Sequence, residues 1–535
     1  MVRDGRAIPE NELVETDLCI IGAGPAGISI AREFIGSRLR VCLLESGGAH
    51  PIRAAQRLND GRTVGYWYYP LASTRARAFG GSSAHWWHQT DEDGRSYVWR
   101  SGPLNPVDFE SRPGIAHTGW PFSREVLIPF YERAQRICQL GPFEYGVEDW
   151  EDPEARPRFP LPRDDVVTSI VQYGNHTFVD YLGELASAQN VTTILNSTVC
   201  ELVTAENPST INEVTVRGQA GNAFRLKARA YVLAAGGIEN ARLLLLSNNT
   251  HTAGLGNTND LVGRFFMERL SIRSGVIVPT DSGLFQRSLL YKIHSARGAH
   301  IQSVLRLNED LMRSAGLLNA AMFVLPAHKA FTSEGVRSLV ALYRAVQLRR
   351  LPGDLLGHAK NVAGGLDDVA LTLYRRVIPR GSANDEVFIL RVQAEQSPNP
   401  SSRVTLDDAR DGFGLRKARL DWRVTEFDRW SIRRTQEILD RELRRAKLGR
   451  LERKLGEEDP PALFQGAFHH MGTTRMHREA SLGVVDADCR VHGLANLFVA
   501  GSSVFPTAGC ANPTLTLVAL AVRLADHLRD ELAAA

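Results

Sequence analysis

Residues 17–48, DLCIIGAGPAGISIAREFIGSRLRVCLLESGG, decide how the chain begins to fold. The apolar run at 17–21 predicts a buried strand, and the glycine-rich turn after it predicts a helix that ends near Phe34. A second apolar run at 40–44 predicts another strand. Strand, glycine turn, helix and strand in this order are typical of a unit that binds a dinucleotide.

Three glycines and one acid have distinct expected roles in this unit. Gly22 permits the tight turn, Gly24 lets a pyrophosphate approach the backbone, and Gly27 lets the helix pack closely on the sheet. The helix N-terminal amides then face the phosphates. Glu45 ends the second strand, where its carboxylate can accept hydrogen bonds from both ribose hydroxyls. The alternative for Glu45 is an acid at a strand end that faces only solvent.

Composition excludes several classes of protein. With 535 residues the chain is long enough for three or four domain-sized units, and 43 % hydrophobic and 23 % charged residues are typical of a globular protein. A net charge of +3 does not suggest nucleic acid as a partner. The six cysteines are scattered without a C-x-x-C pair, so we expect no disulfide scaffold, no zinc finger and a reducing compartment. The histidines show no metal-ligand spacing, and we expect no metal site.

We expect the protein to be cytoplasmic. The stretch before residue 17 has no apolar h-region, so it does not resemble a signal peptide. No 18-residue window is apolar and free of charge, so we predict no transmembrane helix. Export on the signal of a partner protein is the alternative.

Two later stretches repeat the strand, glycine turn and helix pattern. A buried strand at 230–235 runs into Gly236-Gly237 and a helix at 238–246, and a strand at 497–500 runs into Gly501-Ser502-Ser503 before a long helix from Thr514. Both would bring further backbone amides to the cofactor. The middle of the chain instead mixes extended and helical segments and predicts a second domain.

Together these stretches resemble the glucose–methanol–choline (GMC) oxidoreductase family over nearly the whole chain. The resemblance rests on IIGAGPAGISIAREF with Glu45, FGGSSAHWWHQT at 79–90, AAGGIENARLLLLS at 234–247, and HHMGTTRM at 469–476 followed by VAGSSVFPTAGCANPTLTLVALAVRLADHL. A middle stretch, EQSPNPSSRVTLDD, is similar to the family's substrate-domain strands. The last pair is the most specific of these motifs.

The resemblance implies an α/β flavoprotein that binds FAD. Its FAD domain is doubly wound, Rossmann-like and built from separated segments, and a second, α+β domain contains an antiparallel sheet flanked by helices. We place the FAD domain at 1–269, with inserted cap segments at about 50–190, and the substrate domain at 270–465. The C-terminal return to the FAD domain is 466–535 and carries the catalytic pair.

The resemblance also implies a catalytic pair. His469 occupies the first position of the family's H-x-x-G-T motif, where it would take the hydroxyl proton of an alcohol, and neutral imidazole suits that task. His470 is the rival for this role. Asn512, just before Pro513, matches the family's second position and resembles the pyranose oxidase branch. Its amide would orient and polarise the hydroxyl, and the alternative is a plain helix N-cap.

The cofactor-binding residues that the resemblance implies come from all these segments. They are Gly22, Gly24, Pro25, Ala26, Gly27, Glu45, Ser46, Gly80, Gly81, Ser82, His85, Trp86, Val199, Ala235, Gly236, Gly501, Ser502, Pro513 and Thr514. His85 matches the position where some relatives attach the flavin covalently. Ala84 before it differs from the Thr of the fungal pyranose oxidase pattern, so we expect a noncovalent flavin, with the covalent bond as the alternative.

The expected function is therefore oxidation of a CH–OH group of a sugar, glycoside or polyol-like substrate, with oxygen, a quinone or a protein as electron acceptor. The alternatives are a dehydrogenase for a sterol or aromatic alcohol, a lyase that retains FAD, and a non-catalytic flavoprotein subunit. The Arg-rich stretch 336–380 predicts amphipathic helices that are either solvated or dock on a membrane surface or a partner.

Overall fold

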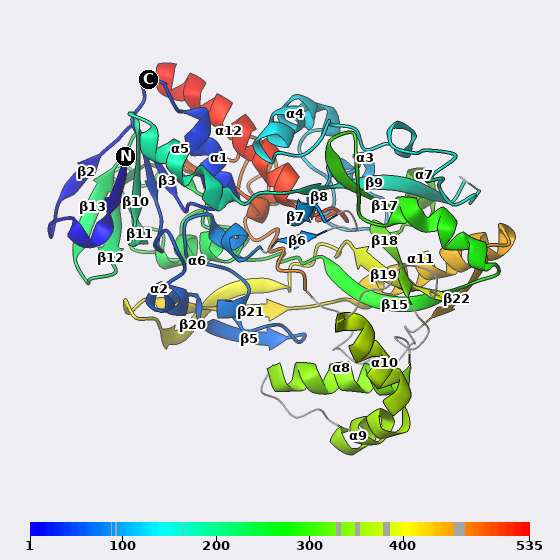
Figure 1. The fold of residues 1–535 in the computed structure, drawn as a ribbon. Coiled ribbons are helices and arrows are strands. Elements are labelled where there is room, and N and C mark those ends of the chain that lie inside the picture. The colour runs from blue at the N-terminus through cyan, green and yellow to red at the C-terminus, as the bar shows by residue number, and fades with distance from the viewer. Residues whose placement is uncertain are drawn as a thin grey trace.

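A computed structural model describes residues 1–86, 88–90, 94–162, 164–327, 333–347, 354–377, 386–453 and 466–534. Two large sheets lie side by side, a parallel one near the termini and an antiparallel one beyond it (Figure 1). Strands and helices from distant parts of the chain build both sheets. This arrangement confirms the predicted α/β class with an antiparallel second sheet.

The parallel sheet has six strands, and four neighbouring ones, β4 (Val41–Leu44), β3 (Leu18–Ile21), β14 (Ala230–Leu233) and β23 (Leu497–Val499), are entirely buried. Apolar runs such as LCII and VCLL suit such positions, because both faces of a parallel sheet are covered by helices. In spatial order its strands are β1 (Val2–Asp4), β10 (Val191–Leu195), β4, β3, β14 and β23.

Helices from both ends of the chain cover this sheet. The first, α1 (Pro25–Glu33), contacts the buried C-terminal helix α12 (Thr514–Ala534), which also contacts α4 (Ile128–Ile137) (Figure 1). The predicted helix after Gly236-Gly237 is α6 (Glu239–Leu246). Shorter helices are α2 (Arg53–Gln56), α3 (Pro106–Phe109), α5 (Leu182–Ser187) and α7 (Glu309–Ala315).

Three small sheets flank the parallel one. They contain β11 (Ser197–Thr204), β12 (Ile211–Gly218), β13 (Ala223–Lys227) and β2 (Leu13–Glu15); β20 (Arg403–Arg410), β21 (Arg416–Trp422) and β5 (Gly61–Gly65); and β6 (Gln89–Thr90) with β7 (Ser96–Tyr97). The stretch EQSPNPSSRVTLDD, at 395–408, runs into β20. Helix α6, which follows β14 of the parallel sheet, contacts β20 and β21.

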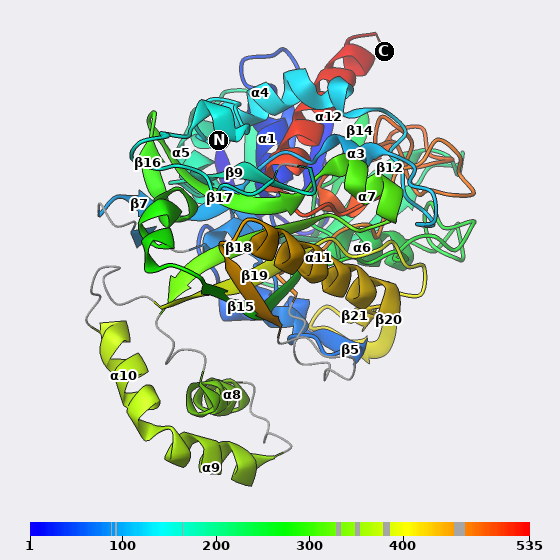
Figure 2. The same cartoon turned by 90° about the vertical axis from the view of Figure 1, so that its right-hand side faces the viewer.

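The large antiparallel sheet has eight strands. They are β22 (Gly449–Arg453), β15 (Leu270–Pro279), β19 (Val387–Ala394), β18 (Ala320–Ala327), β17 (Ala299–Leu307), β9 (Val166–Gly174) and β8 (Trp99–Ser101) in spatial order, with β16 (His294–Ala296) beside β17. Helix α11 (Glu426–Arg445) lies across it (Figure 2). Another face packs Ala321 and Phe323 against Cys510, just before α12.

The domain boundaries at 269 and 465 stay predictions. The structure does show that β8 and β9, from the stretch 50–190 that we assigned to cap segments, pair within the antiparallel sheet through Arg100 and Tyr173. The antiparallel sheet is therefore assembled from both halves of the chain, and its strands β9, β17 and β18 contribute to the lining of the smaller cavity described below.

Helices α8 (Glu334–Gln347), α9 (Leu355–Gly364) and α10 (Leu366–Val377) stand apart from the two sheets in both views (Figures 1 and 2). They contact one another, and Tyr343, Leu356 and Leu366 are exposed. Most arginine side chains of the stretch 336–380 lie outside the described residues, so docking through this stretch stays a prediction. None of the described helices is both long and apolar enough to span a membrane.

Candidate active site

A cavity of about 590 Å³ opens at the carboxyl ends of β3, β4, β14 and β23, where doubly wound sheets bind their ligands. Nineteen of the predicted site residues line it: Gly22, Gly24, Pro25, Ala26, Glu45, Ser46, Gly81, Ser82, His85, Trp86, Val199, Ala235, Gly236, His469, Gly501, Ser502, Asn512, Pro513 and Thr514. The volume is in the usual range for cofactor sites. Stretches from the beginning, middle and end of the chain therefore converge on one site.

Gly27 and Gly80 are predicted cofactor residues that do not line this cavity. A Cβ on Gly27 would lie 2.0 Å from the carbonyl oxygen of Gly22, so this glycine allows α1 to pack against the turn. Gly80 has a φ of +89°, and a Cβ there would lie 2.6 Å from Val179 Cγ2. Both glycines shape the backbone around the site.

The glycine turn fits the pyrophosphate of a dinucleotide. Gly22 has a φ of +110°, and a Cβ there would lie 2.6 Å from the carbonyl oxygen of Ala234. Gly24 and Gly81 approach so closely that a Cβ on Gly81 would lie 2.9 Å from Gly24 Cα. No side chain caps the N-terminus of α1, so its first amides stay available to an anion.

Glu45 lies at the carboxyl end of β4 and is 5 % exposed. Its Oε2 accepts a hydrogen bond from Ala23 N at 3.0 Å, and its Oε1 accepts one from Gly47 N at 2.7 Å. Burial raises the pKa of this carboxyl, and the amides of Gly47 and Ala23 act against that shift. Each carboxylate oxygen retains a second lone pair, which suits the predicted contact with a ribose.

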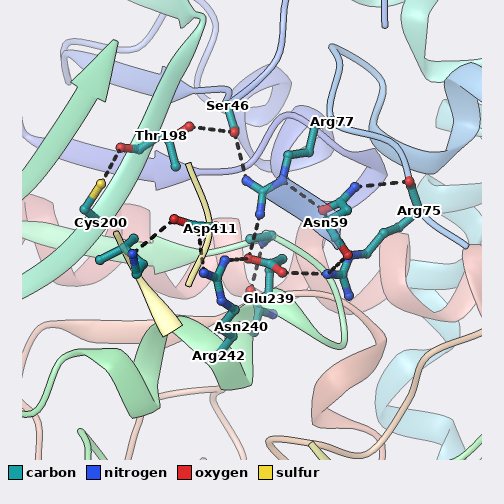
Figure 3. A network of polar contacts seen from close by, with 12 residues as sticks. Ser46, Asn59, Arg75, Arg77, Thr198, Cys200, Glu239, Asn240, Arg242 and Asp411 are labelled. Atoms are coloured by element: carbon teal, nitrogen blue, oxygen red, sulfur yellow. Dashed lines mark hydrogen bonds and ion pairs between the residues drawn. The ribbon is translucent and has the colours of Figure 1, made fainter. Parts of the chain in front are cut away.

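A buried network of ion pairs and hydrogen bonds forms part of the lining of the larger cavity (Figure 3). Arg75 and Arg77 each donate to a different oxygen of Glu239, at 2.8 and 2.7 Å. Both also donate to Asn59 Oδ1, at 3.0 and 2.8 Å. Arg242 donates to Glu239 at 3.2 Å, so three guanidinium groups surround one carboxylate.

The network links elements that are distant in the sequence (Figure 3). Arg77 Nη1 donates to Ser46 Oγ at 2.8 Å, and Ser46 hydrogen-bonds to Thr198 on β11 at 2.8 Å. Arg242 pairs with Asp411 at 2.6 Å. Our sequence analysis missed this network. Its only sequence signal was two arginines, at 75 and 77, just before a glycine motif.

The predicted base, His469, lies on the loop that enters the cavity after Gly466. Within the described part of the chain its Nδ1 is buried and has no hydrogen-bond partner. Burial lowers the pKa of His469 well below 6.5, and the nearby charges of Arg269 and Arg100 lower it further. The ring is therefore neutral near pH 7 and has a lone pair with which to accept a proton.

The rival, His470, is engaged elsewhere. Its Nε2 lies 2.9 Å from Tyr68 Oη, and Tyr68 donates its own proton to Glu268. His470 must therefore be the donor to Tyr68, with its proton on Nε2. Burial and the charge of Arg75 lower the pKa of His470 to about 3.

Glu268 positions the loop that carries His469. This fully buried carboxylate accepts hydrogen bonds at Oε2 from the backbone amides of Ala467 and His469, both at 3.0 Å. Its Oε1 accepts from Tyr68. Because the contacts span about 200 residues of sequence, spacing could not reveal Glu268 or Tyr68.

We expect Glu268→Gln to slow flavin reduction about tenfold to a hundredfold. In either orientation the NH₂ group of Gln faces a donor, either the amides of Ala467 and His469 or the hydroxyl of Tyr68, and displacement of a catalytic group by about 1 Å costs about this much. Stopped-flow reduction at saturating substrate would measure the effect, with KM and flavin content unchanged. Glu201→Gln, at a half-buried site outside the cavity, is the control, and an unaltered reduction rate in Glu268→Gln would refute the positioning role.

Asn512 lies just before α12, and Arg269 donates from Nη1 to its Oδ1. No residue in the described part of the chain accepts a hydrogen bond from Asn512 Nδ2, which leaves that donor available to a substrate oxygen. Pro513, which precedes α12, and Thr514, its first residue, also line the cavity. The helix therefore directs its positive N-terminal end at the site.

Asn512 also lines a second cavity of about 300 Å³, between the start of α12 and the antiparallel sheet. Its walls include Phe323 on β18 and Val304 on β17. The larger cavity thus lies over the parallel sheet and the smaller one over the antiparallel sheet, with Asn512 between them. Such an arrangement suits a cofactor in the first and a substrate in the second.

His85 and Trp86 lie on the short helix Gly81–His85 and just after it. His85 is exposed and lines the larger cavity, while Trp86 stacks on Trp99 with ring centroids 5.0 Å apart. Trp87, which follows in the same motif, lies outside the described residues. In the described ranges, no three His, Cys, Asp or Glu side chains are arranged to hold a metal ion.

Comparison with known proteins agrees with this site. Residues 398–521 match the family model described as GMC oxidoreductase, and residues 17–251 match the model described as FAD dependent oxidoreductase. The chain is 25 % identical to 2-methyl-1,2-propanediol dehydrogenase of Mycolicibacterium austroafricanum over 96 % of this chain and 95 % of that protein. It is 41 % identical to C-glycoside 3-oxidase of Arthrobacter globiformis over 25 % of each chain.

Among solved structures, pyridoxine 4-oxidase from Mesorbium loti has the same fold, with a TM-score of 0.53 and 18 % identity over 96 % of this chain and 99 % of that one. Both family models cover segments that line the larger cavity, and the glycine cradle fits the cofactor they imply. The chain thus resembles the GMC oxidoreductases, through the separate segments 17–251 and 398–521, and the comparisons support an FAD-dependent oxidoreductase that acts on alcohol groups.

Proposed function

We propose that this enzyme oxidises a CH–OH group of a sugar, glycoside or polyol-like substrate, with His469 as the base. One observation carries the proposal: His469 and Asn512 both line the larger cavity, and Asn512 also lines the smaller one. A substrate hydroxyl placed there would face both side chains. When bound, FAD would supply the acceptor for the hydride that leaves the same carbon.

His469 would take the hydroxyl proton on a free ring nitrogen. Its lowered pKa keeps it in the neutral form that can accept this proton. The hydrogen bond from His469 N to Glu268 keeps the backbone of the loop in place while the ring changes charge. Removing the proton leaves negative charge on the substrate oxygen, so a donor must face that oxygen.

Asn512 Nδ2 is the donor that would face the oxygen. Because Arg269 binds Oδ1, the amide cannot rotate to present its acceptor without losing a charge-assisted hydrogen bond. Arg269 thereby fixes which end of Asn512 meets the substrate and brings a positive charge close to the developing negative one. This supports the catalytic role of Asn512 over that of a plain N-cap.

The known relatives support a hydroxyl-bearing substrate of modest size. One relative that aligns over 96 % of this chain is named for a diol, and one that is 41 % identical over 25 % of it is named for a C-glycoside. The smaller cavity, of about 300 Å³, is at the lower end of the range for small-molecule sites. A large sterol, one of the alternative substrates, fits this volume less well than a sugar or polyol.

Anaerobic bleaching of the flavin absorbance tests this proposal directly. The panel contains aldoses, glycosides, diols, polyols, a sterol and a benzylic alcohol. We expect reduction by at least one sugar, glycoside or polyol. Reduction by the sterol or benzylic alcohol alone would contradict the proposal, and a flavin that no alcohol bleaches would leave a lyase or a non-catalytic subunit.

We also propose that the flavin is bound without a covalent bond to His85. The surroundings of His85 support this, since its side chain is exposed and Ala84 precedes it. Acid precipitation would then leave all the yellow colour in the supernatant. Colour in the pellet that Trp86→Phe retains and His85→Ala loses would show the covalent bond instead.

A further inference from the structure

Among the described residues, the smaller cavity is lined by four arginines, Arg100, Arg124, Arg269 and Arg306, and by no acidic side chain. Such a lining is unusual for a site that binds a neutral sugar, because burying a guanidinium without a counter-charge costs free energy. Among the described residues, none of the four forms an ion pair with a carboxylate. We therefore expect an anionic group from outside the chain to balance their positive charge.

Of the four arginines, Arg306 is the one whose positive charge the described contacts explain least. It lies on β17 opposite Ala321 of β18, and Ala321 packs with Cys510, so this face of the sheet points toward the start of α12. Its Nε is buried and finds no acceptor within the described part of the chain. A half-buried guanidinium with a buried, unpaired N–H is a ready site for an anion.

Arg269 and Arg100 bring the same charge closer to the base. Arg269 is 3 % exposed, donates from Nη1 to Asn512 Oδ1, and has a buried Nε that no described acceptor meets. Arg100 donates to Gln393 Oε1 and lies 4.1 Å from the ring centroid of Phe323. All of these contacts are to neutral groups, so they satisfy donors without cancelling charge.

The buried carboxylates nearest the cavity are already engaged. Glu395 forms a two-point ion pair with Arg112, at 2.6 and 2.9 Å. Asp108 accepts hydrogen bonds from Asn319 Nδ2 at 2.9 Å and from Asn105 N at 2.8 Å. Glu268 accepts hydrogen bonds from Tyr68 Oη and from the backbone amides of Ala467 and His469. None of the three lines the smaller cavity or forms an ion pair with its arginines; the charge of Glu268 acts on the adjacent Arg269, and Arg306 has no such neighbour among these three.

We propose that the smaller cavity selects an alcohol that carries an anionic group, a carboxylate or a phosphate, bound by Arg306 together with Arg269 and Arg100. This inference rests on the proposed function, since it names the class of substrate oxidised at the same site. A guanidinium offers a planar pair of N–H groups that matches both anions. A sugar acid, a hydroxy acid and a sugar phosphate therefore share the chemistry that the cavity recognises.

An anionic substrate would also help the base. The charges of Arg269 and Arg100 oppose protonation of His469, yet the reaction requires this ring to become positively charged. A bound anion would cancel part of that repulsion at the time when the proton moves. A neutral substrate would leave two uncompensated guanidinium groups beside the imidazolium. Proton transfer to His469 and the arginine lining of the smaller cavity thus both favour an anionic substrate.

The test compares binding of glucuronate and glucose, which differ by a carboxylate in place of a CH₂OH group. Anaerobic calorimetric titration of the holoenzyme measures both, with glucose 6-phosphate as the phosphate analogue. We expect the carboxylate, the phosphate or both to bind about tenfold more tightly than glucose. We expect Arg306→Gln to remove most of this difference without weakening glucose binding, and Arg306→Lys to restore part of it.

Arg313→Gln is the matched control, because Arg313 pairs with Glu110 on the surface and does not line the cavity. If neither anion binds more tightly than glucose, or if Arg306→Gln weakens all three ligands alike, the inference is wrong. The readout is binding, so this result leaves the proposed oxidation standing. Conversely, a flavin that no alcohol bleaches would refute the proposed function even where the anions bind.

Discussion

Replacing His469 with Ala should slow anaerobic reduction of the flavin by about 10²–10⁴-fold, the usual contribution of a positioned general base. The variant loses the only group that we assign to accept the hydroxyl proton, while Asn512 and Arg269 still orient the substrate. Flavin content should not change, because the backbone amide that binds Glu268 is retained. Stopped-flow measurement at saturating substrate would show the loss in the rate of reduction with little change in Kd.

Two other histidines make this experiment decisive. His470→Phe removes the rival base but keeps an aromatic ring near Tyr68 and Phe266, so we expect a loss of less than about tenfold. His251→Ala changes an exposed ring that contacts Pro208 and should alter nothing. A larger loss in His470→Phe than in His469→Ala would reverse our assignment of the base.

The pH dependence gives an independent check of the same residue. A base works only when unprotonated, so activity falls as pH drops through its pKa in the free enzyme. Burial and the charges of Arg269 and Arg100 lower the pKa of His469. The plot of kcat/KM should therefore stay level as pH falls through 6.5. An acid limb at or above pH 6.5 that vanishes in His469→Ala would contradict the environment described for this ring.

The parts of the fold that local sequence determines were predictable. Strands β3 and β4 are apolar runs next to glycine turns, and the motifs around Gly24, Gly81 and Gly501 impose conformations or close approaches that few other residues allow. The larger cavity follows from these motifs, because the carboxyl ends of parallel strands meet at one edge of the sheet. For these strands, glycine turns and the larger cavity, the local sequence was therefore enough to predict the structure.

The supporting shell of the site was not predictable in this way. Glu239 meets Arg75 across 164 residues, and Glu268 meets Tyr68 across 200. Spacing along one sequence contains no information about such contacts, because they depend on how the sheets pack. The four arginines of the smaller cavity come from separate segments for the same reason. Only the structure shows that they line the same cavity and that none of them forms an ion pair with a described carboxylate.

Replacing Glu239 with Gln should lower the free energy of unfolding by about 3–5 kcal/mol, the cost of breaking a buried ion pair by removing one partner. Burial raises the pKa of Glu239, and the charges of Arg77, Arg242 and Arg75 outweigh burial and bring that pKa to about 2. Relative to the ordinary value of 4.5, this shift corresponds to about 3 kcal/mol of stabilisation. The two estimates agree in size.

The sign of the pH effect separates this explanation from a simple packing defect. Because the pKa of Glu239 is lower in the folded protein, its stabilisation is complete above about pH 4.5 and disappears as pH falls toward 2. The difference between wild type and Glu239→Gln in urea unfolding should therefore be constant from pH 7 to 5 and shrink below. Glu213→Gln, which loses a half-exposed pair with Arg225 at 3.4 Å, should cost less than about 1 kcal/mol. A Glu239→Gln difference that does not shrink in acid would mean that lost packing, rather than the loss of a carboxylate shared by three guanidinium groups, destabilises the variant.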